Sequence, residues 1–227
     1  MTQFMSNSLF FGAAISLIAY EAGLLLKRKF KMAIFNPLLI AIIAVIAVLC
    51  LLHIDYDTYN QSGQYISYLL TPATVCLAVP LYQQMELLKK NLKAVIIGIV
   101  SGVLASLVSV LILARLFRLS HEQYVTLLPK SITTAIGMGV SEELGGIVTI
   151  TVAVIIITGV LGNMVAETVI KLAHIEEPIA KGLALGTSSH AIGTAKAMEL
   201  GEIEGAMSSL AIAVAGLLTV VGASVFA

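Results

Sequence analysis

The sequence lacks tryptophan, holds only two cysteines and carries little charge, since Asp, Glu, Lys and Arg together make up 11% of its 227 residues. A soluble domain ordinarily contains about 25% charged residues, so this composition excludes an ordinary soluble globular protein. The formal net charge is zero, which gives no reason to expect a nucleic-acid partner. Cys50 and Cys76 lie within apolar runs, where they predict small buried side chains rather than a disulfide framework or a metal site.

Hydrophobic residues make up 59% of the chain, and they recur in continuous runs of about 20, the length that a helix needs to cross a bilayer. Continuous runs argue against a transmembrane β-barrel, whose strands alternate apolar and polar residues. The sequence therefore predicts an all-α integral membrane protein, a multi-spanning helical bundle that forms a single transmembrane domain over residues 1–227. The N-terminus lacks a basic region and a cleavage site, so we expect its first span to be retained.

Two basic clusters predict the orientation. A peripheral first span is expected within residues 8–34, and Lys27–Lys31 lies near the end of this range. Lys89–Lys93 lies further along the chain. Cytoplasmic loops of membrane proteins carry an excess of lysine and arginine, so both clusters are expected on the cytoplasmic side. A second span is expected over residues 35–52, and the polar stretch after it, residues 53–64, is expected to be an outer loop.

The first half of the chain, residues 35–118, contains prolines where a span is expected. Pro72 and Pro80 fall within residues 66–84, and a proline inside a helix removes a backbone donor and clashes with the preceding turn. We therefore predict a broken helix over residues 66–84. The run that follows, residues 94–117, is expected to be an ordinary apolar span.

The second half repeats itself at a spacing of 56 residues. Seven of thirteen positions are identical when Ala135–Ile147 is aligned with Ala191–Ile203. The copies belong to repeat units 127–170 and 182–226, in each of which a short glycine-rich segment precedes one apolar span. If the short segment does not cross the membrane, the two units point in opposite directions, as in the inverted repeats of many secondary transporters. The alternative is that small residues recur only because they let helices pack closely.

The glycine-rich segments, residues 127–142 and 182–200, are predicted to be discontinuous or re-entrant helices, with a break near Gly186. Irregular backbone inside a bilayer is tolerated only where it is buried or lines a cavity. A helix that begins there presents free N–H groups at the positive end of its dipole, which suits a small anion. We therefore expect a midplane site for a small carboxylate or hydroxy acid, formed by Ser131, Thr133, Thr134, Gly137, Thr187, Ser188, Ser189, His190, Gly193 and Thr194.

Ionisable residues within these segments are further candidates, because charge is costly inside a membrane and by default indicates function. His190 could bind a carboxylate or carry a coupled proton. Lys196 could do the same, or it could extend its ammonium group to the interface. Glu143 and Glu199 occupy equivalent repeat positions, where they could serve in proton coupling or charge pairing or could be helix-terminal charges.

An enzymatic function finds little support in the sequence. Ser188, His190 and Lys196 could be combined into an intramembrane hydrolase, but no nucleophile elbow and no phosphate-binding loop surround them. We therefore expect no enzyme activity, no catalytic residues, no cofactor and no metal.

Three stretches, Tyr68–Tyr82, Leu127–Gly137 and most specifically Leu183–Ala197, resemble the antiholin-like LrgB/CidB family, and the resemblance extends from about Pro37 to the C-terminus. It implies a regulator of murein hydrolases and cell lysis that acts with a small holin-like partner of the LrgA/CidA type. It also implies transport of small acids, because a plant member moves glycolate and glycerate across the plastid envelope. Bacterial members have been tied to pyruvate or related short acids.

The residues and the resemblance together predict a secondary transporter of small monocarboxylates or 2-hydroxy acids, such as glycolate, glycerate, pyruvate or lactate. The alternative is an antiholin-like regulator of murein hydrolase activity and lysis that acts with the holin-like partner. Either protein is expected to be a multi-pass protein of the bacterial plasma membrane, in contact with the lipid bilayer, and a homo-oligomer is expected.

Overall fold

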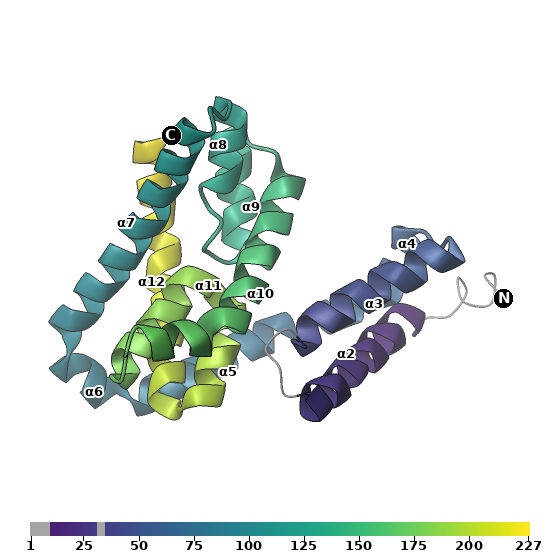
Figure 1. Cartoon of the computed structure of the whole chain (residues 1–227), viewed down its shortest axis with the longest axis horizontal. Coiled ribbons are helices and arrows are strands. Elements are labelled where there is room, and N and C mark those ends of the chain that lie inside the picture. The colour runs from purple at the N-terminus through teal and green to yellow at the C-terminus, as the bar shows by residue number, and fades with distance from the viewer. Residues whose placement is uncertain (1–9, 31–34) are drawn as a thin grey trace. The chain divides into compact units, whose positions relative to one another are not determined.

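The computed structural model describes residues 10–30 and 35–227, and the regular structure in these ranges is entirely helical. The all-α prediction is thereby confirmed. Within the expected transmembrane domain the chain forms two compact units, Met1–Cys76 and Leu77–Ala227 (Figure 1). Four helical segments are long and apolar enough to cross a membrane, namely Tyr56–Gln83, Leu92–Leu116, Val148–Leu172 and Glu202–Phe226.

In the first unit, α2 (Phe11–Phe30) packs against α3 (Pro37–Leu52) through the small side chains of Ala19 and Ala41. The start of α3 is set by Asn36, whose side chain accepts hydrogen bonds from two backbone N–H groups of the first turn at 2.9 and 3.2 Å. The proline that follows Asn36 suits the first helical position, where its missing N–H has no helical acceptor.

The polar stretch after α3 is helical, so the prediction of an outer loop over residues 53–64 is wrong. α4 (Tyr56–Ser67) covers most of this stretch, and a hydrogen bond of 2.6 Å from the Gly12 N–H to Ser62 Oγ joins it to α2. Ser62 is fully buried there, so one face of this stretch packs against the protein although its composition is polar. The expected first span, residues 8–34, extends beyond the described residues at both ends, and α2 is its described part.

The two prolines of residues 66–84 have different effects on the helix. A break at Tyr68 and Leu69 separates α4 from α5 (Leu70–Gln83). Pro72 lies directly after this break, in the first turn of α5, where a missing N–H costs no helical hydrogen bond. Pro80 lies inside α5, and the helix continues beyond it.

The second unit is built from seven helices that lie wholly within it. Three are long, α7 (Leu92–Leu116), α10 (Val148–Leu172) and α12 (Glu202–Phe226), and four are shorter or interrupted, α6 (Met85–Lys90), α8 (His121–Leu127), α9 (Thr134–Glu143) and α11 (Pro178–Leu200). Between Val95 and Ala114, α7 buries about one residue per turn in a core shared with the alanines and Met207 of α12. Small side chains let membrane helices approach closely, which stabilises them where no hydrophobic effect drives association.

The long helices α10 and α12 run in opposite directions (Figure 1). The start of α10 lies beside α8, because the Ile147 N–H donates to Thr126 Oγ1 at 2.8 Å. The end of α12 lies beside the same helix, because Tyr124 Oη donates to the carbonyl of Phe226 at 2.9 Å. α10 therefore leads away from α8, and α12 leads towards it.

α11 turns back on itself halfway along its length. Ser189 (φ −131°, ψ 15°) and His190 (φ 43°, ψ −137°) leave the helical conformation. A Cβ added to Gly193 would lie 2.5 Å from the carbonyl oxygen of Leu185, whereas a straight helix would separate these residues by about 12 Å. α11 is therefore a hairpin, called here the second hairpin, whose two arms meet at Ser189 and His190.

The predicted break near Gly186 lies three residues later, at Ser189. Gly186 belongs to the regular first arm of the second hairpin, where a Cβ would lie 2.5 Å from the carbonyl oxygen of Ser208 on α12. The missing side chain of Gly186 therefore permits close helix packing, and it does not interrupt the helix.

Residues 121–143 form the corresponding first hairpin, made of α8, a turn and α9. The chain leaves α8 at Leu127, turns at Lys130–Thr133, and returns through α9 until Gly146 lies beside Thr126. A shift of 56 residues places the start of α9, Thr134, on the break at His190. Because α10 and α12 are antiparallel, the two hairpins enter the helical bundle from opposite sides, as an inverted repeat predicts.

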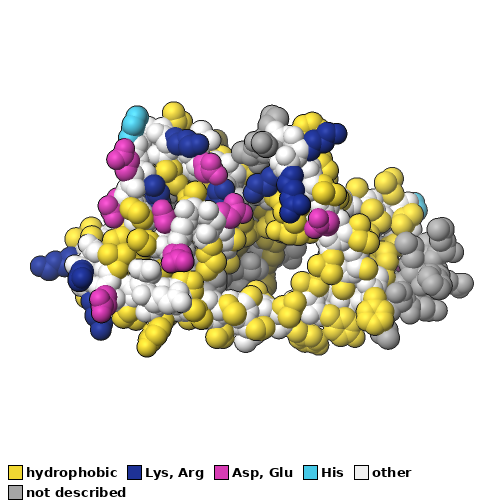
Figure 2. Space-filling view, turned by 90° about the horizontal axis from the view of Figure 1, so that it is seen from below, with side chains coloured by type: hydrophobic (Ala, Val, Ile, Leu, Met, Phe, Trp, Pro, Cys, Tyr) yellow, Lys and Arg dark blue, Asp and Glu magenta, His cyan; other side chains and the backbone are white. Residues whose placement is uncertain are grey.

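Charged side chains gather at one end of the second unit. This end carries α6 and the connection between α10 and α11, and the view from below shows side chains of both signs there (Figure 2). α6 supplies Lys89 and Lys90 in its last turn. By the excess of basic residues in cytoplasmic loops, we predict that this end faces the cytoplasm.

Candidate functional site

The tips of the two hairpins meet beside the middle of α7. Gly102 of α7 faces the second hairpin, because an added Cβ would lie 2.7 Å from Thr187 Oγ1. One turn further along, Ser106 Oγ donates a hydrogen bond of 3.0 Å to Ser131 Oγ at the tip of the first hairpin. Gly102 and Ser106 lie on either side of the midpoint of α7, so hairpins from opposite ends reach a similar depth.

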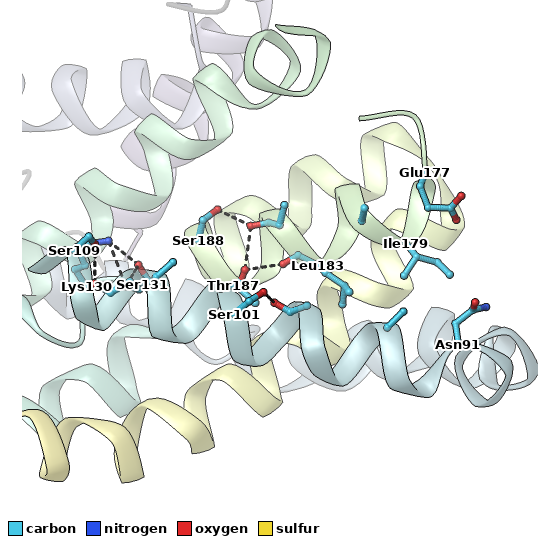
Figure 3. A pocket seen from close by; sticks show the side chains of 17 residues that line it. Asn91, Ser101, Ser109, Lys130, Ser131, Glu177, Ile179, Leu183, Thr187 and Ser188 are labelled. Carbon is cyan, nitrogen blue, oxygen red and sulfur yellow. Dashed lines mark hydrogen bonds between the residues drawn. The ribbon is translucent and has the colours of Figure 1, made fainter. Parts of the chain in front are cut away.

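A pocket of about 800 Å³ lies between α7 and the two tips (Figure 3). It extends along α7 from Asn91, at the charged end, to Ser109 beyond the midpoint. Glu177 lines the end near Asn91, and Lys130 lines the end near Ser109. The hydroxyl groups along the pocket belong to Ser101, Ser106, Ser109, Ser131, Thr187 and Ser188.

α7 is the apolar span expected over residues 94–117, and the pocket adds a polar face that this expectation did not include. One face of α7 carries only small or hydroxyl side chains in the pocket, at Gly98, Ser101, Gly102, Ala105, Ser106 and Ser109. A neighbouring face, about a third of the way around the helix, carries exposed large side chains such as Ile97 and Leu104. The spacing of three and four residues between the small residues is visible in the sequence and could have revealed this face.

Lys130 is a site residue that the sequence analysis missed. Its Nζ donates hydrogen bonds to Ser131 Oγ at 2.9 Å and to Ser106 Oγ at 3.5 Å. The ion pairs of the described residues do not include Lys130. The signal was present, since a lysine within the apolar stretch Leu127–Ile132 is costly in a membrane and marks a functional candidate.

Three of the predicted site residues, Ser131, Thr187 and Ser188, line the pocket. Thr187 Oγ1 donates to the carbonyl of Leu183 at 2.8 Å, and Ser188 Oγ donates to the carbonyl of Ala184 at 2.7 Å. Because both hydroxyl protons are used within the helix, the oxygen lone pairs remain to accept hydrogen bonds. The second hairpin therefore offers acceptors to the pocket, and Lys130 offers a charged donor.

The residues at the break of the second hairpin contact α10 and do not line the pocket. His190 is 4% exposed, and its Nε2–H donates to the carbonyl of Ile155 at 2.9 Å. Its ring fills the space left by Gly159, where an added Cβ would lie 2.7 Å from Nε2. Ser189 likewise occupies the space beside Gly162. These contacts fix the hairpin to α10.

The remaining predicted residues pack the hairpins against their neighbours. Thr194 is fully buried, and its Oγ1 lies 2.7 Å from Ser208 Oγ on α12. Gly193 lets the two arms of α11 touch, and Gly137 leaves room for Ile155 of α10. Thr133 and Thr134, which begin α9, are half-buried and lie outside the pocket lining.

Lys196 forms an ion cluster between the second hairpin and α10. Its Nζ lies 2.6 Å from Glu167 Oε1 and 3.0 Å from Glu199 Oε2, and its side chain is 11% exposed. Glu143, the repeat equivalent of Glu199, is exposed at the end of α9. Among the residues that the structure describes, no three His, Cys, Asp or Glu side chains come together as metal ligands.

Comparison with known proteins identifies relatives along nearly the whole chain. The sequence model of the LrgB-like family matches residues 16–227. The Antiholin-like protein LrgB of Bacillus mycoides (strain KBAB4) is 40% identical over 213 residues, 93% of either chain. Proteins of the same name from Bacillus cereus (strain B4264) and Bacillus anthracis (strain CDC 684 / NRRL 3495) are 39% identical over the same share of both chains. No solved structure matches the chain.

Proposed function

This chain belongs to the LrgB-like family, and we propose that it acts, as the names of its relatives say, as an antiholin-like protein in the bacterial plasma membrane. The observation that carries the proposal is the sequence identity of 40% with the Bacillus mycoides protein over 93% of both chains. An antiholin restrains a pore within the bilayer, so it must contact a membrane partner through side chains that face lipid. The large exposed side chains of α7, among them Ile97 and Leu104, offer such a face.

Co-expression with a small holin-like membrane protein tests this proposal. We expect the chain to reduce murein hydrolase activity and the release of a cytoplasmic enzyme that the holin-like protein causes alone. Ile97→Ala together with Leu104→Ala should weaken this protection, because the pair removes apolar contacts from the lipid-facing side of α7. Ser131→Ala, inside the pocket, is the matched control and should protect fully. Equal lysis with and without the chain would contradict the proposal.

The geometry of the second unit favours a second candidate function, secondary transport of small monocarboxylates or 2-hydroxy acids such as glycolate, glycerate, pyruvate or lactate. The observation that carries it is the meeting of two polar hairpin tips, which enter from opposite ends, at the middle of α7. Secondary transporters with inverted repeats bind substrate between discontinuous helices at this depth. A pocket of about 800 Å³ is ample for acids of this size.

Uptake into proteoliposomes tests the transport proposal. Purified full-length protein should take up radiolabelled glycolate, pyruvate or lactate saturably, and a pH gradient should change the rate if protons are coupled. Empty liposomes and liposomes with heat-denatured protein are the controls. Failure to take up any of the three acids, with protein that circular dichroism shows to be helical, would contradict transport and leave the antiholin proposal in place.

A further inference from the structure

Lys130 carries a positive charge deep within the second unit. Its ammonium group contacts Ser106 of α7, about 15 Å along the helix from Leu116 and about 21 Å from Leu92. If α7 spans the bilayer, both ends of the helix are too far for the side chain to reach the interface. A cation at such depth requires a counter-charge or a water-filled cavity.

The other lysine buried in a hairpin shows how this chain neutralises such a charge. Lys196 lies within 3.0 Å of two carboxylates, Glu167 and Glu199. Among the residues that the structure describes, the hydrogen-bond partners of Lys130 are the hydroxyl groups of Ser106 and Ser131. An ammonium group has three N–H donors, so one donor of Lys130 is left beyond these two contacts.

The pocket holds one carboxylate, and it lies far from Lys130. Glu177 precedes the first arm of α11, whereas Thr187 lies near the tip of that arm, about 15 Å further along the helix. In Figure 3 Glu177 and Lys130 accordingly appear at opposite ends of the pocket. The protein groups that the structure describes therefore leave the charge of Lys130 unneutralised, and the space beside it is open to a ligand.

We propose that Lys130 is the anion-binding residue of this pocket and that it takes the carboxylate of a small monoanion. The assignment rests on the transport proposal and deepens it by naming the residue that holds the substrate charge. Ser106 and Ser131 fix the ammonium group at the meeting point of the two hairpins. Thr187 and Ser188 supply acceptors for a hydroxyl group of the same ligand.

Two pairs of variants of the full-length protein test the assignment. Lys130→Met removes the charge, whereas Lys130→Arg keeps a permanent cation. Ser106→Asp places a carboxylate beside the ammonium group and competes with the ligand, whereas Ser106→Asn has the same shape without the charge. Ser106→Asp creates an ion pair, so it should fold even if Lys130→Met does not. Lys171→Met, at the exposed end of α10, controls for the loss of a positive charge.

Two quantities are measured. The first is the concentration of radiolabelled glycolate that gives half-maximal uptake, and the second is the rise in melting temperature that glycolate causes in detergent. We expect Lys130→Met and Ser106→Asp to raise the half-saturating concentration on the order of a hundredfold and to abolish the thermal shift. The half-saturating concentration and the thermal shift should both stay at their wild-type values in Lys130→Arg, Ser106→Asn and Lys171→Met. Wild-type half-saturation in Lys130→Met and Ser106→Asp would overturn the assignment and leave transport intact.

If the wild-type protein takes up no glycolate, transport fails and the thermal shift decides the assignment by itself. A shift in the wild-type protein that Lys130→Met and Ser106→Asp abolish would support Lys130 as the anion-binding residue. Absence of any shift in the wild-type protein would overturn it.

Discussion

Replacing Gly186 by alanine tests whether this glycine is needed for close packing of α11 against α12. If it is, the substitution lowers the free energy of unfolding. Alanine in place of a helical glycine ordinarily adds about 1 kcal/mol of stability. At Gly186, however, the new Cβ would lie 2.5 Å from the carbonyl oxygen of Ser208, 2.7 Å from Ala211 Cβ and 3.0 Å from Ser208 Cα. These are mostly backbone atoms, which cannot move aside without displacing α12.

Overpacking of a well-packed core costs about 1–3 kcal/mol, and three contacts at or below 3.0 Å place Gly186→Ala at the upper part of this range. After the gain in helix propensity, we expect a net loss of about 1–2 kcal/mol. Reversible unfolding in mixed detergent micelles, followed by circular dichroism, measures it. Gly139→Ala on α9 is the control, because nothing lies within 4 Å of its Cβ, and it should be stabilised. A Gly186→Ala protein as stable as the wild type would refute the packing argument.

Three further predictions concern the ion cluster and the pocket. Lys196→Met should destabilise the protein by about 1–2 kcal/mol, which is less than the loss of a fully buried ion pair because Glu167 is half-exposed. A double-mutant cycle with Glu167→Gln measures the coupling between the two side chains, and additive effects would contradict this coupling. Thr187→Val removes a hydrogen-bond acceptor, so the preference for glycolate over acetate in competition uptake should fall about tenfold; an unchanged ratio would count against this role. Ser101→Cys, in a protein without its native cysteines, should react with a charged maleimide from the cytoplasmic side and be protected by glycolate, whereas labelling from the outer side alone would contradict the orientation.

The sequence predicts the helical class for a local reason. Continuous apolar runs require helices in a bilayer. The 56-residue repeat aligns Thr134 with His190, and the structure interrupts or begins a helix at both places. Gly186 was a poorer guide, because glycine in a membrane helix can mark close packing as well as a break.

Pairing of buried polar groups could not be predicted, because the partners are distant in sequence. His190 and Lys196 both looked like ligands for a substrate. The structure gives His190 a backbone partner, Ile155, and gives Lys196 a carboxylate partner, Glu167, both on α10. Lys130 lay in the same kind of apolar segment, yet the ion pairs of the described residues do not include it. The sequence shows where ionisable groups are, and the fold decides which of them are neutralised.

The two candidate functions depend on different faces of α7, and this makes them separable. The pocket face carries Ser101 and Ser106, whereas Ile97 and Leu104 lie exposed on a neighbouring face. A partner helix that is recognised through the exposed face would leave the pocket accessible, so restraint of a pore and binding of an anion can coexist in one molecule. If the bound anion also controls the restraint, variants of Lys130 will alter lysis even though they do not touch the partner. If the two functions are independent, each face will affect only its own assay.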